Sequence, residues 1–483
     1  MDEAAIILTT LVAYKVMMIF VGLWAASRNR SEADFFLGGR GLGPLVAGLS
    51  YAASTSSAWV ILGFSGFVYA IGLSALWMIP GVWAAYAVVW LYFGRQLRQE
   101  SLEHQQVTLT DFLLHDSSGD LKRIATVAAA VLVVFCFVFY VAAQLDAAGN
   151  ALTENFAIAT PTAIVTGAVI VVFYSLVGGF WAVSVTDTIQ AAIMMLVSVG
   201  VPLAALVAAG GPVEMWTTLT AAMPTAYLQL DGGHAGLVLL GFAVGLVGMS
   251  LGALGQPHLL ARLMAVRGET ERRQGYAIVF GWGIVVFAGM VVLGLSGRAL
   301  VPEIGNPETL FYRAASDYLP VVLAGIATAA TLSAVMSTVD SLLLSAAGAV
   351  AHDMGVNRRF PGREAMASRA AMFGVAALAV VLALSLPDTI FNRVLFAWSA
   401  LGAAFGPIVL FRVMGRDVAA APALAAMLSG FAVAVLFYSL GSAPAGDSLL
   451  SQAAHLPGDP FERVAPWLPP MLILWFFTQK RRK

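Results

Sequence analysis

Long apolar stretches separated by short polar connections make up almost the whole chain. A helix needs about 20 apolar residues to cross a bilayer, and the sequence contains thirteen stretches of that kind. The predicted spans are Ala4–Ala26, Leu45–Tyr69, Leu73–Phe93, Ile124–Ala148, Thr162–Phe180, Thr188–Ala209, Leu237–Gly255, Tyr276–Leu295, Val321–Val350, Ala370–Leu386, Ile390–Phe411, Ala421–Leu440 and Pro466–Phe477. The last of these is short and is interrupted by Pro469 and Pro470.

The placement of Lys and Arg supports this count and gives an orientation. Basic residues collect in the cytoplasmic connections of membrane proteins. With the N-terminus outside, most of the 26 basic residues fall on the cytoplasmic side: Arg28, Arg30, Arg40, Arg95, Arg98, Lys122, Arg123, Arg262, Arg267, Arg272, Arg273, Arg358, Arg359, Arg363, Arg369, Arg412, Arg416 and Lys480 to Lys483. The other side holds Arg298, Arg313, Arg393 and Arg463, and Lys15 lies inside the first span. We therefore expect a multi-pass protein of the cell inner membrane with a cytoplasmic C-terminus.

Composition agrees with a lipid environment. The chain is 60% hydrophobic and 11% charged, whereas soluble domains carry roughly 25% charged residues. The net charge of −1 gives no indication of nucleic-acid binding, and the single cysteine, Cys136, cannot form an internal disulfide. No separate soluble domain is visible, so residues 1–483 are predicted to be one all-α transmembrane domain whose partner is the lipid bilayer.

Two of the predicted spans contain residues that weaken a helix. The second span carries Ser54–Ser57 between Gly48 and Gly63, and the seventh carries four glycines and a proline between Gly245 and Pro257. Hydroxyl side chains can satisfy backbone groups where a membrane helix unwinds. Close packing of small residues against a neighbouring helix is the alternative explanation for each stretch.

The spacing of the two stretches favours broken helices. They lie five spans apart and therefore begin from opposite sides of the membrane, as an inverted repeat of five helices requires. The predicted organisation is a leading helix (4–26), a first repeat (45–209), a second repeat (237–411) and two C-terminal helices (421–477). Substrate and coupling ion would bind at the midplane, where both helices break.

Polar residues inside other spans are candidates for the ion site, because such residues are costly in lipid. In the ninth span Ser333, Ser337, Ser341 and Ser345 recur every four residues and share one helix face. Their hydroxyl oxygens are ligands of the kind that hard cations prefer, although a small-residue interface would give the same pattern. Asp340 lies beside this face, deep in the span, and Asp187 lies near the start of the sixth span.

Motifs for catalysis are missing from the sequence. Gly38–Gly43 lacks the strand–helix context of a nucleotide loop, no serine has nucleophile-elbow spacing, and no two histidines have metal-ligand spacing. We interpret His258 and His352 as structural residues near span ends. An enzyme is therefore not expected.

Five ordered motifs resemble the sodium:solute symporter family. They are Asp34–Gly43, Gly178–Ser184 leading to Thr186 and Asp187, Gly255–His258, Met336–Ser341, and Phe396–Ser399 continuing through Gly402 to Pro407. The resemblance extends to about Arg416 and is strongest to bacterial sodium/proline symporters. It implies a LeuT-like fold of two inverted five-helix repeats with one extra N-terminal helix and two C-terminal helices, and sodium as the bound ion.

The resemblance also implies site residues. The main sodium site corresponds to backbone carbonyls of Ala53, Ser56 and Ala334 and to hydroxyls of Ser337 and Thr338. Asp187 corresponds to an aspartate implicated in ion coupling, and Tyr140 has a counterpart among proline transporters. We expect a second cation or coupling site to involve Asp187, Asp340 and Ser341. The substrate-binding candidates are Ser54, Thr55, Ser57, Tyr140, Gln144, Met249, Ala253 and Gln256.

Three positions depart from the proline transporters. Those proteins carry an aspartate at the position of Thr55 and a tryptophan and a tyrosine at the positions of Met249 and Ala253. Without both rings a proline would lose the surfaces on which it stacks, so we expect the pocket to accept a different or larger solute, such as another amino acid or a small carboxylate.

The expected function is sodium-coupled import of a small polar solute, such as proline or a related compound, by alternating access. A proton-coupled carrier of the same fold and a transporter-like sensor are the alternatives. The sequence leaves the stoichiometry and the oligomeric state open.

Overall fold

The computed structural model describes residues 3–26, 32–156, 158–176, 179–360, 363–386 and 389–480. Some residues used in the sequence analysis lie outside these ranges. They are Arg28, Arg30, Gly178 and the terminal residues 481–483.

The described chain is helical apart from one pair of two-residue strands, β1 (Arg416–Asp417) and β2 (Gln479–Lys480), which pair antiparallel. The first half contains α1 (Glu3–Ala26), α2 (Glu32–Leu37), α3 (Pro44–Ala58), α4 (Ser65–Ile71), α5 (Met78–Ala87), α6 (Gly94–Glu103), α7 (Leu109–Leu113), α8 (Gly119–Phe156), α9 (Thr160–Ser175), α10 (Phe180–Ala208) and α11 (Gly211–Ala222). The second half contains α12 (Gly236–Gly248), α13 (Pro257–Ala265), α14 (Glu269–Leu300), α15 (Leu310–Tyr318), α16 (Val321–Ala347), α17 (Glu364–Ser385), α18 (Ile390–Val413), α19 (Ala420–Ser442), α20 (Leu449–Ala454), α21 (Pro460–Arg463) and α22 (Leu468–Phe477).

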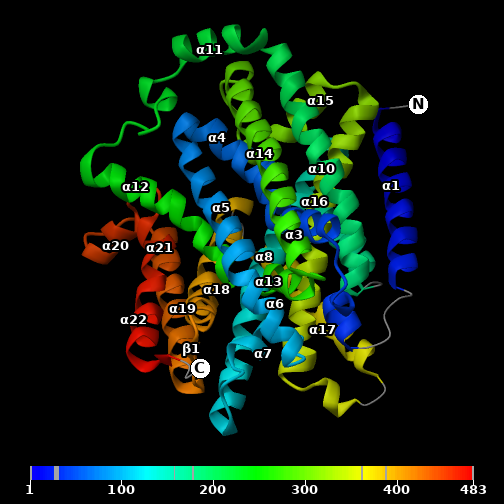
Figure 1. Ribbon diagram of the computed structural model, residues 1–483. Coiled ribbons are helices and arrows are strands. Elements are labelled where there is room, and N and C mark those ends of the chain that lie inside the picture. Colours follow the sequence, from blue (N-terminus) through cyan, green and yellow to red (C-terminus); the bar gives the residue numbers. More distant parts are fainter. Residues whose placement is uncertain are drawn as a thin grey trace.

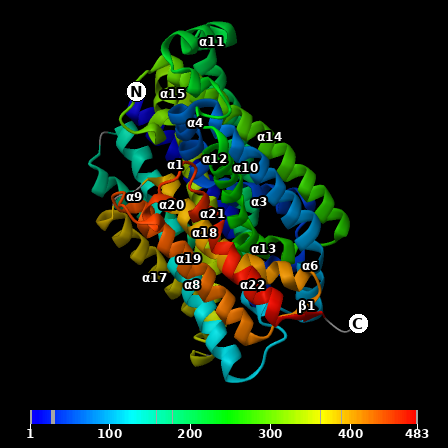
Figure 2. The ribbon, with the colours of Figure 1, turned by 90° about the vertical axis from the view of Figure 1, so that its left-hand side faces the viewer.

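The longer helices of this set are apolar enough to cross a membrane. Among the described residues, nine helical runs are long and apolar enough to span a bilayer. One of them, Pro44–Glu103, turns at Gly72, and Figure 1 shows it running up through α4 and back down through α5 and α6. Figures 1 and 2 place α11 and the N-terminus at one end of the bundle and β1 and the C-terminus at the other. An odd number of membrane crossings places the two termini at opposite ends of the bundle in this way.

The observed helices correct several predicted boundaries, two of them close to Asp187, and the interpretation of the last span. The fifth span ends at Ser175 instead of Phe180, and the sixth begins at Phe180 instead of Thr188. Asp187 therefore lies two turns inside α10 and is fully buried. Pro469 and Pro470 do not interrupt the last helix but begin it, because the first turn of a helix has no use for the missing N–H groups.

Both predicted interruptions are present. Helix α3 contains one residue with non-helical backbone, Ser57, at φ 40° and ψ −163°. The seventh span changes at Gly248 from α12 to a 3₁₀ segment, Met249–Gly255, and α13 starts after Gln256. The two breaks are what an inverted repeat with a broken first helix in each half requires. The repeat boundaries at 45–209 and 237–411 remain predictions.

Helices outside the ten-helix region pack at its edges. Helix α1 lies against α10 and α16, at the right of Figure 1. Helices α19 and α22 pack on each other and on α18, and Figure 2 shows them together on one side of the bundle. These are the positions expected for one leading and two C-terminal helices.

Glycines allow the broken seventh span to approach α18 closely. A Cβ atom added to Gly402 would lie 2.5 Å from the Cα atom of Gly252, and one added to Gly255 would lie 2.5 Å from the carbonyl oxygen of Leu401. Real Cβ atoms do not come this close to backbone atoms. The contact between the 3₁₀ segment and α18 therefore requires small residues on both sides, as helix interfaces in lipid commonly do.

We predict that Gly402→Ala lowers the unfolding midpoint of the purified protein, because overfilling a packed contact costs about 1–3 kcal/mol. The matched control is Gly281→Ala on α14, where the added Cβ meets no atom within 4 Å. Both changes gain the same helix propensity, roughly 1 kcal/mol, so the difference between their midpoints reports the contact. Equal midpoints would contradict this account of the interface.

Candidate functional site

The break in α3 is held by side chains from inside and outside the helix. The Ser57 hydroxyl accepts a hydrogen bond from the backbone N–H of Trp59 at 3.2 Å, and Gln144 Oε1 on α8 accepts one from the N–H of Ala58 at 3.2 Å. The Trp59 indole donates to the carbonyl of Thr55 at 2.8 Å. Backbone groups freed at Ser57 thus find partners without water, which explains how a non-glycine residue keeps a positive φ angle here.

Opposite the break, α16 presents the predicted hydroxyl face. Ser337 Oγ and Thr338 Oγ1 donate to the carbonyl of Ala334 at 3.0 and 3.1 Å, and Thr338 Oγ1 lies 3.5 Å from the carbonyl oxygen of Ser54. All these residues are buried, and Ala53 and Ser56 flank Ser54 in the last turn before the break. Thr338 of the predicted sodium site thus contacts the turn of α3 that contains Ala53 and Ser56, through the carbonyl of Ser54, which is not itself a predicted ligand.

A buried ion pair closes the space on the α7 side of this contact. Arg262 on α13 donates to Asp187 on α10 at 2.8 Å, and the exposed fractions of the two side chains are 1% and 0%. The guanidinium also donates to hydroxyls of Ser50 at 2.8 Å and of Ser54 and Ser341 at 2.6 Å. One cationic side chain thus joins α3, α10, α13 and α16.

The second predicted cation group is only partly assembled. Ser341 and Asp187 share the Arg262 guanidinium. Asp340 instead faces α9, where the Ser175 hydroxyl donates to its carboxylate, and its charge interacts with Lys15 of α1. One carboxylate oxygen of each aspartate, Oδ1 of Asp187 and Oδ2 of Asp340, has no hydrogen-bond partner among the described residues.

Several substrate candidates surround the break. Gln144 Nε2 lies 3.4 Å from the Ser57 hydroxyl. The Tyr140 hydroxyl is directed toward Ser57 and Trp398 but has no hydrogen bond within the described chain, and neither amide atom of Gln256 has one. Buried polar atoms in native proteins are nearly always bonded, so the unpaired atoms of Tyr140 and Gln256 indicate a place for a ligand.

The three departures from the proline transporters take different positions. Thr55 is turned into its own helix, where its hydroxyl donates to the carbonyl of Tyr51 at 2.7 Å. Met249 and Ala253 are buried in the 3₁₀ segment. The aromatic surface near this region comes from Trp398 and Trp59, whose rings meet edge to face with centroids 6.0 Å apart.

Cavities approach the site from both ends. On the α11 side, a cavity of about 260 Å³ is lined by Met249, Phe67 and Phe391 and reaches the loop residue His234. On the α7 side, a cavity of about 40 Å³ extends from Ser341 and Ser345 to Asp353.

Arg262 is the site residue that the sequence analysis missed. It was assigned to a cytoplasmic connection because it precedes Arg267, Arg272 and Arg273. A signal was nevertheless present, since Arg262 is the only charge within the helix Pro257–Ala265 and has apolar residues on both sides. Arg412 and Arg393 were likewise assigned to connections but are buried, in ion pairs with Glu100 and Asp146.

A family model for the sodium:solute symporter family matches residues 35–430, most of the chain. The chain belongs to the sodium:solute symporter family. It is therefore a sodium-coupled solute transporter and not an enzyme, and sodium is its co-substrate and not a resident cofactor. The family assignment also places the chain among multi-pass membrane proteins and selects sodium over the proton-coupled alternative.

Relatives of this symporter include transporters of known substrate. A high-affinity proline transporter of Bacillus subtilis (strain 168) is 31% identical over 435 residues, which are 88% of this chain and 90% of the relative. An osmoregulated proline transporter of the same organism is 30% identical and covers 90% and 89% of the two chains. A sodium/proline symporter of Staphylococcus aureus (strain JH9) is 32% identical, with 88% and 84% covered.

Solved structures confirm the fold of this symporter. A sodium-coupled sialic acid symporter in a substrate-bound outward-open state superposes with a TM-score of 0.77 at 15% identity, covering 99% of this chain and 100% of that one. A nucleobase-cation-symport-1 family transporter in a closed conformation gives a TM-score of 0.51 at 13% identity, with 93% and 95% covered. The predicted LeuT-like architecture is confirmed.

We predict that Arg262→Met destabilises the protein strongly, because it leaves the Asp187 carboxylate buried without its counter-ion, at a cost of about 3–5 kcal/mol. The double variant Arg262→Met/Asp187→Asn should regain much of the loss, since it removes the unpaired charge. Unfolding midpoints of both variants test this.

The matched control for that cycle is Arg273→Met, which removes an arginine that is 72% exposed and paired with Glu269 at i,i+4. Exposed pairs of this kind contribute about 0.3–0.5 kcal/mol, so its midpoint should hardly change. A double variant no more stable than Arg262→Met would show that the two groups are not coupled.

Proposed function

We propose that this symporter imports a small polar solute of the amino-acid class, with one sodium ion bound between the break in α3 and the hydroxyl face of α16. The proposed ligands are carbonyl oxygens of Ala53, Ser56 and Ala334 and hydroxyls of Ser337 and Thr338. The approach of Thr338 Oγ1 to the Ser54 carbonyl at 3.5 Å is the observation that carries the proposal, because it brings oxygen donors of both helices into one buried place.

Sodium at this position would add an ionic contact between two helices that already meet through hydrogen bonds of Ser54 and Thr338. The Ser337 and Thr338 hydroxyls now donate to the carbonyl of their own helix, and a rotation about χ1 would turn their oxygens toward a cation. The bound charge would draw the carbonyls of the broken turn toward α16. This favours the arrangement in which the substrate residues next to the break are in place, so sodium would bind before the solute.

Asp187 and Ser341 are proposed as part of the inner cation path. The Arg262 guanidinium now occupies the space between their oxygens, so a sodium ion moving along the α16 face would compete with it. Separation of Arg262 from Asp187 would open the route from Ser341 into the cavity that ends at Asp353. Asp340, which faces Ser175, would act on this path only through its charge.

The solute is proposed to bind beside the break, where Ser57, Gln144, Tyr140 and Gln256 supply hydrogen-bonding atoms. Proline is the substrate named for the relatives, and a polar zwitterion suits these groups. Met249 and Ala253 provide no ring to stack on, and Thr55 adds no charge. An amino acid other than proline, or a small carboxylate, is therefore included in the proposal.

The direction of transport follows from the proposed orientation in the cell inner membrane, with the α11 end outside and the α7 end in the cytoplasm. The basic residues at the α7 end support it. One positive charge moving inward across 100 mV releases about 2.3 kcal/mol, which is available to concentrate the solute.

We predict that Ser337→Ala together with Thr338→Ala raises the sodium concentration that gives half-maximal uptake by at least about tenfold, equivalent to 1.4 kcal/mol of binding energy. Solute uptake into proteoliposomes, measured over a range of sodium concentrations, tests it. The control is Ser296→Ala on α14, which removes a buried hydroxyl bonded to Met215 and should leave sodium activation unchanged. Unaltered sodium dependence in the double variant would rule out this ion site.

We also predict that sodium, but not potassium, raises the unfolding midpoint of the purified protein, and that one class of solute raises it further in sodium only. A ligand that binds only the native state stabilises it by RT ln(1 + L/Kd) at free ligand concentration L, so the midpoint rises with ligand concentration. A panel of proline, other amino acids, sugars and carboxylates would identify the class. Stabilisation by a sugar and by no amino acid would contradict the proposed substrate.

A further inference from the structure

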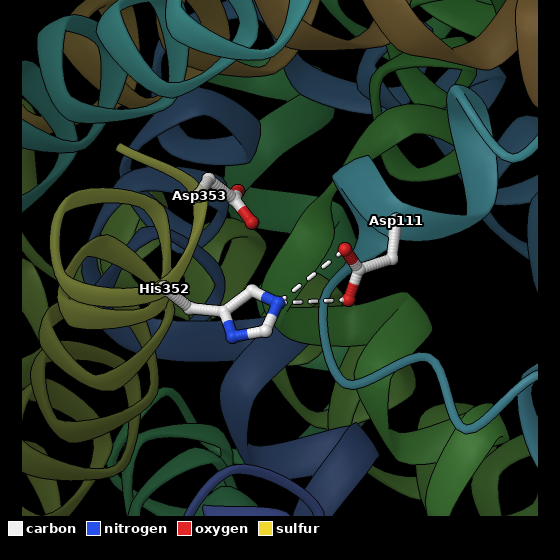
Figure 3. Close-up of side chains that lie close together, drawn as sticks. All are labelled: Asp111, His352 and Asp353. Carbon is white, nitrogen blue, oxygen red and sulfur yellow. Dashed lines mark hydrogen bonds and ion pairs between the residues drawn. The ribbon is translucent and has the colours of Figure 1, made fainter. Parts of the chain in front are cut away.

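A cluster of metal-ligating side chains lies outside the transport site, at the α7 end of the molecule. Asp111 is on α7, and His352 and Asp353 end the π-helical segment Gly348–Asp353 that continues α16. Figure 3 shows the three side chains converging on one small space. Their ligand atoms all lie within 4.8 Å of one another, and His352 Nε2 is 3.1 Å from Asp111 Oδ2.

Local structure fixes the Asp111 carboxylate. Asp111 forms a capping box with Thr108, and its Oδ2 atom accepts from the backbone N–H groups of Val107 and Thr108 at 3.0 and 3.2 Å. The Thr108 hydroxyl donates to Asp353 Oδ1 at 2.8 Å. Both carboxylates are therefore oriented before any ligand arrives, and preorganised donors are what a metal site needs.

The electrostatic environment favours a cation here. Two carboxylates lie next to the C-terminal end of the 33-residue helical run Val321–Asp353, where the unpaired carbonyls give a helix its negative end. Each of the three side chains is only partly buried, so an ion can reach them from the water on this side.

The donor set indicates which cation. A hard cation such as Mg²⁺ prefers oxygen ligands and keeps much of its water, whereas an imidazole nitrogen combined with carboxylates suits Zn²⁺ and other transition metals. Zinc ligands at about 2.0–2.1 Å from the metal in a tetrahedron lie roughly 3.3 Å apart, close to the present separation of His352 and Asp111. A plain His–Asp ion pair would explain the contact of Asp111 with His352, and the hydrogen bond from Thr108 places Asp353 beside them; a metal ion would use all three side chains at once.

The cluster also lies on the proposed inner path. Asp353 and Thr108 line the 40 Å³ cavity whose other end is Ser341 and Ser345. A metal bridging Asp111 on α7 to the end of the α16 run would hold those two elements together at the mouth of this cavity.

We propose that Asp111, His352 and Asp353 form a binding site for a divalent transition metal, with Zn²⁺ as its probe, and that the bound metal slows transport by holding the inner mouth closed. The inhibition rests on the proposed function, whereas the metal site itself does not.

Calorimetric titration of the purified full-length protein with ZnCl₂ tests the site. We expect one ion per chain at this site, affinity at least about tenfold weaker in His352→Ala and in Asp353→Asn, and no comparable heat from MgCl₂. The matched control is His104→Ala/His115→Ala. It removes two stacked imidazoles at this end, whose ring centroids are 4.0 Å apart, and it should leave the zinc affinity unchanged. Asp353→Asn retains the size of the side chain, so its zinc affinity tests the metal site if His352→Ala does not fold.

Two results would overturn the metal site. They are unchanged zinc affinity in both His352→Ala and Asp353→Asn, or loss of zinc binding in the His104/His115 variant alone.

For inhibition, zinc added on the α7 side of proteoliposomes should reduce sodium-driven uptake of the wild type and spare Asp353→Asn. Binding without any effect on an active transporter would overturn the inhibition and leave the site. A preparation without sodium-driven uptake would count against the proposed function instead.

Discussion

A backbone polar group inside a membrane must find a partner within the protein, and the broken turn of α3 is where this constraint shapes the molecule. At Ser57 the helix gives up its regular hydrogen bonds, and Gln144, the Ser57 hydroxyl and the Trp59 indole supply replacements. The Ser54 carbonyl in this turn lies 3.5 Å from the Thr338 hydroxyl of α16. The residues that make the break tolerable are thus the same residues that surround the candidate ion and solute sites. Stability and binding depend on one set of contacts.

The second constraint is the cost of burying charge. Arg262 and Asp187 could not both remain at 1% exposure or less without each other and without the hydroxyls of Ser50, Ser54 and Ser341. Their network connects the first broken helix to α13, the continuation of the second one. Any motion that opens the α7 side has to separate these groups or carry them together. The network therefore links the conformations of the two broken helices, which an alternating-access mechanism needs.

The long apolar stretches, and the small and helix-weakening residues inside two of them, were sufficient to predict the helices and both breaks. Lipid permits few other structures for so apolar a chain. The same patterns did not predict which charged side chains are buried or which partners they have. Arg262 was assigned to a cytoplasmic connection, and Asp187 to a coupling site near the start of a span, yet the two side chains pair with each other in the interior. Asp340 was grouped with the hydroxyl face but lies against Ser175, since neighbours on a helix point to different sides. Pairing across distant helices is invisible to a reading of one segment at a time.

In the proposed mechanism sodium would leave the protein along α16. The charged and neutral groups along that route change from one end to the other. Near the break there are only neutral oxygens. Farther along, the Arg262 guanidinium occupies the oxygens of Ser341 and Asp187, so a cation could bind there only after Arg262 moves away. At the mouth, Asp353 and Asp111 attract one. An ion released from the proposed sodium site would thus meet a buried ion pair and then two carboxylates, so its proposed passage along α16 would require the Arg262 side chain to move. The two carboxylates at the mouth would attract another cation as well, which is the basis of the proposed metal site.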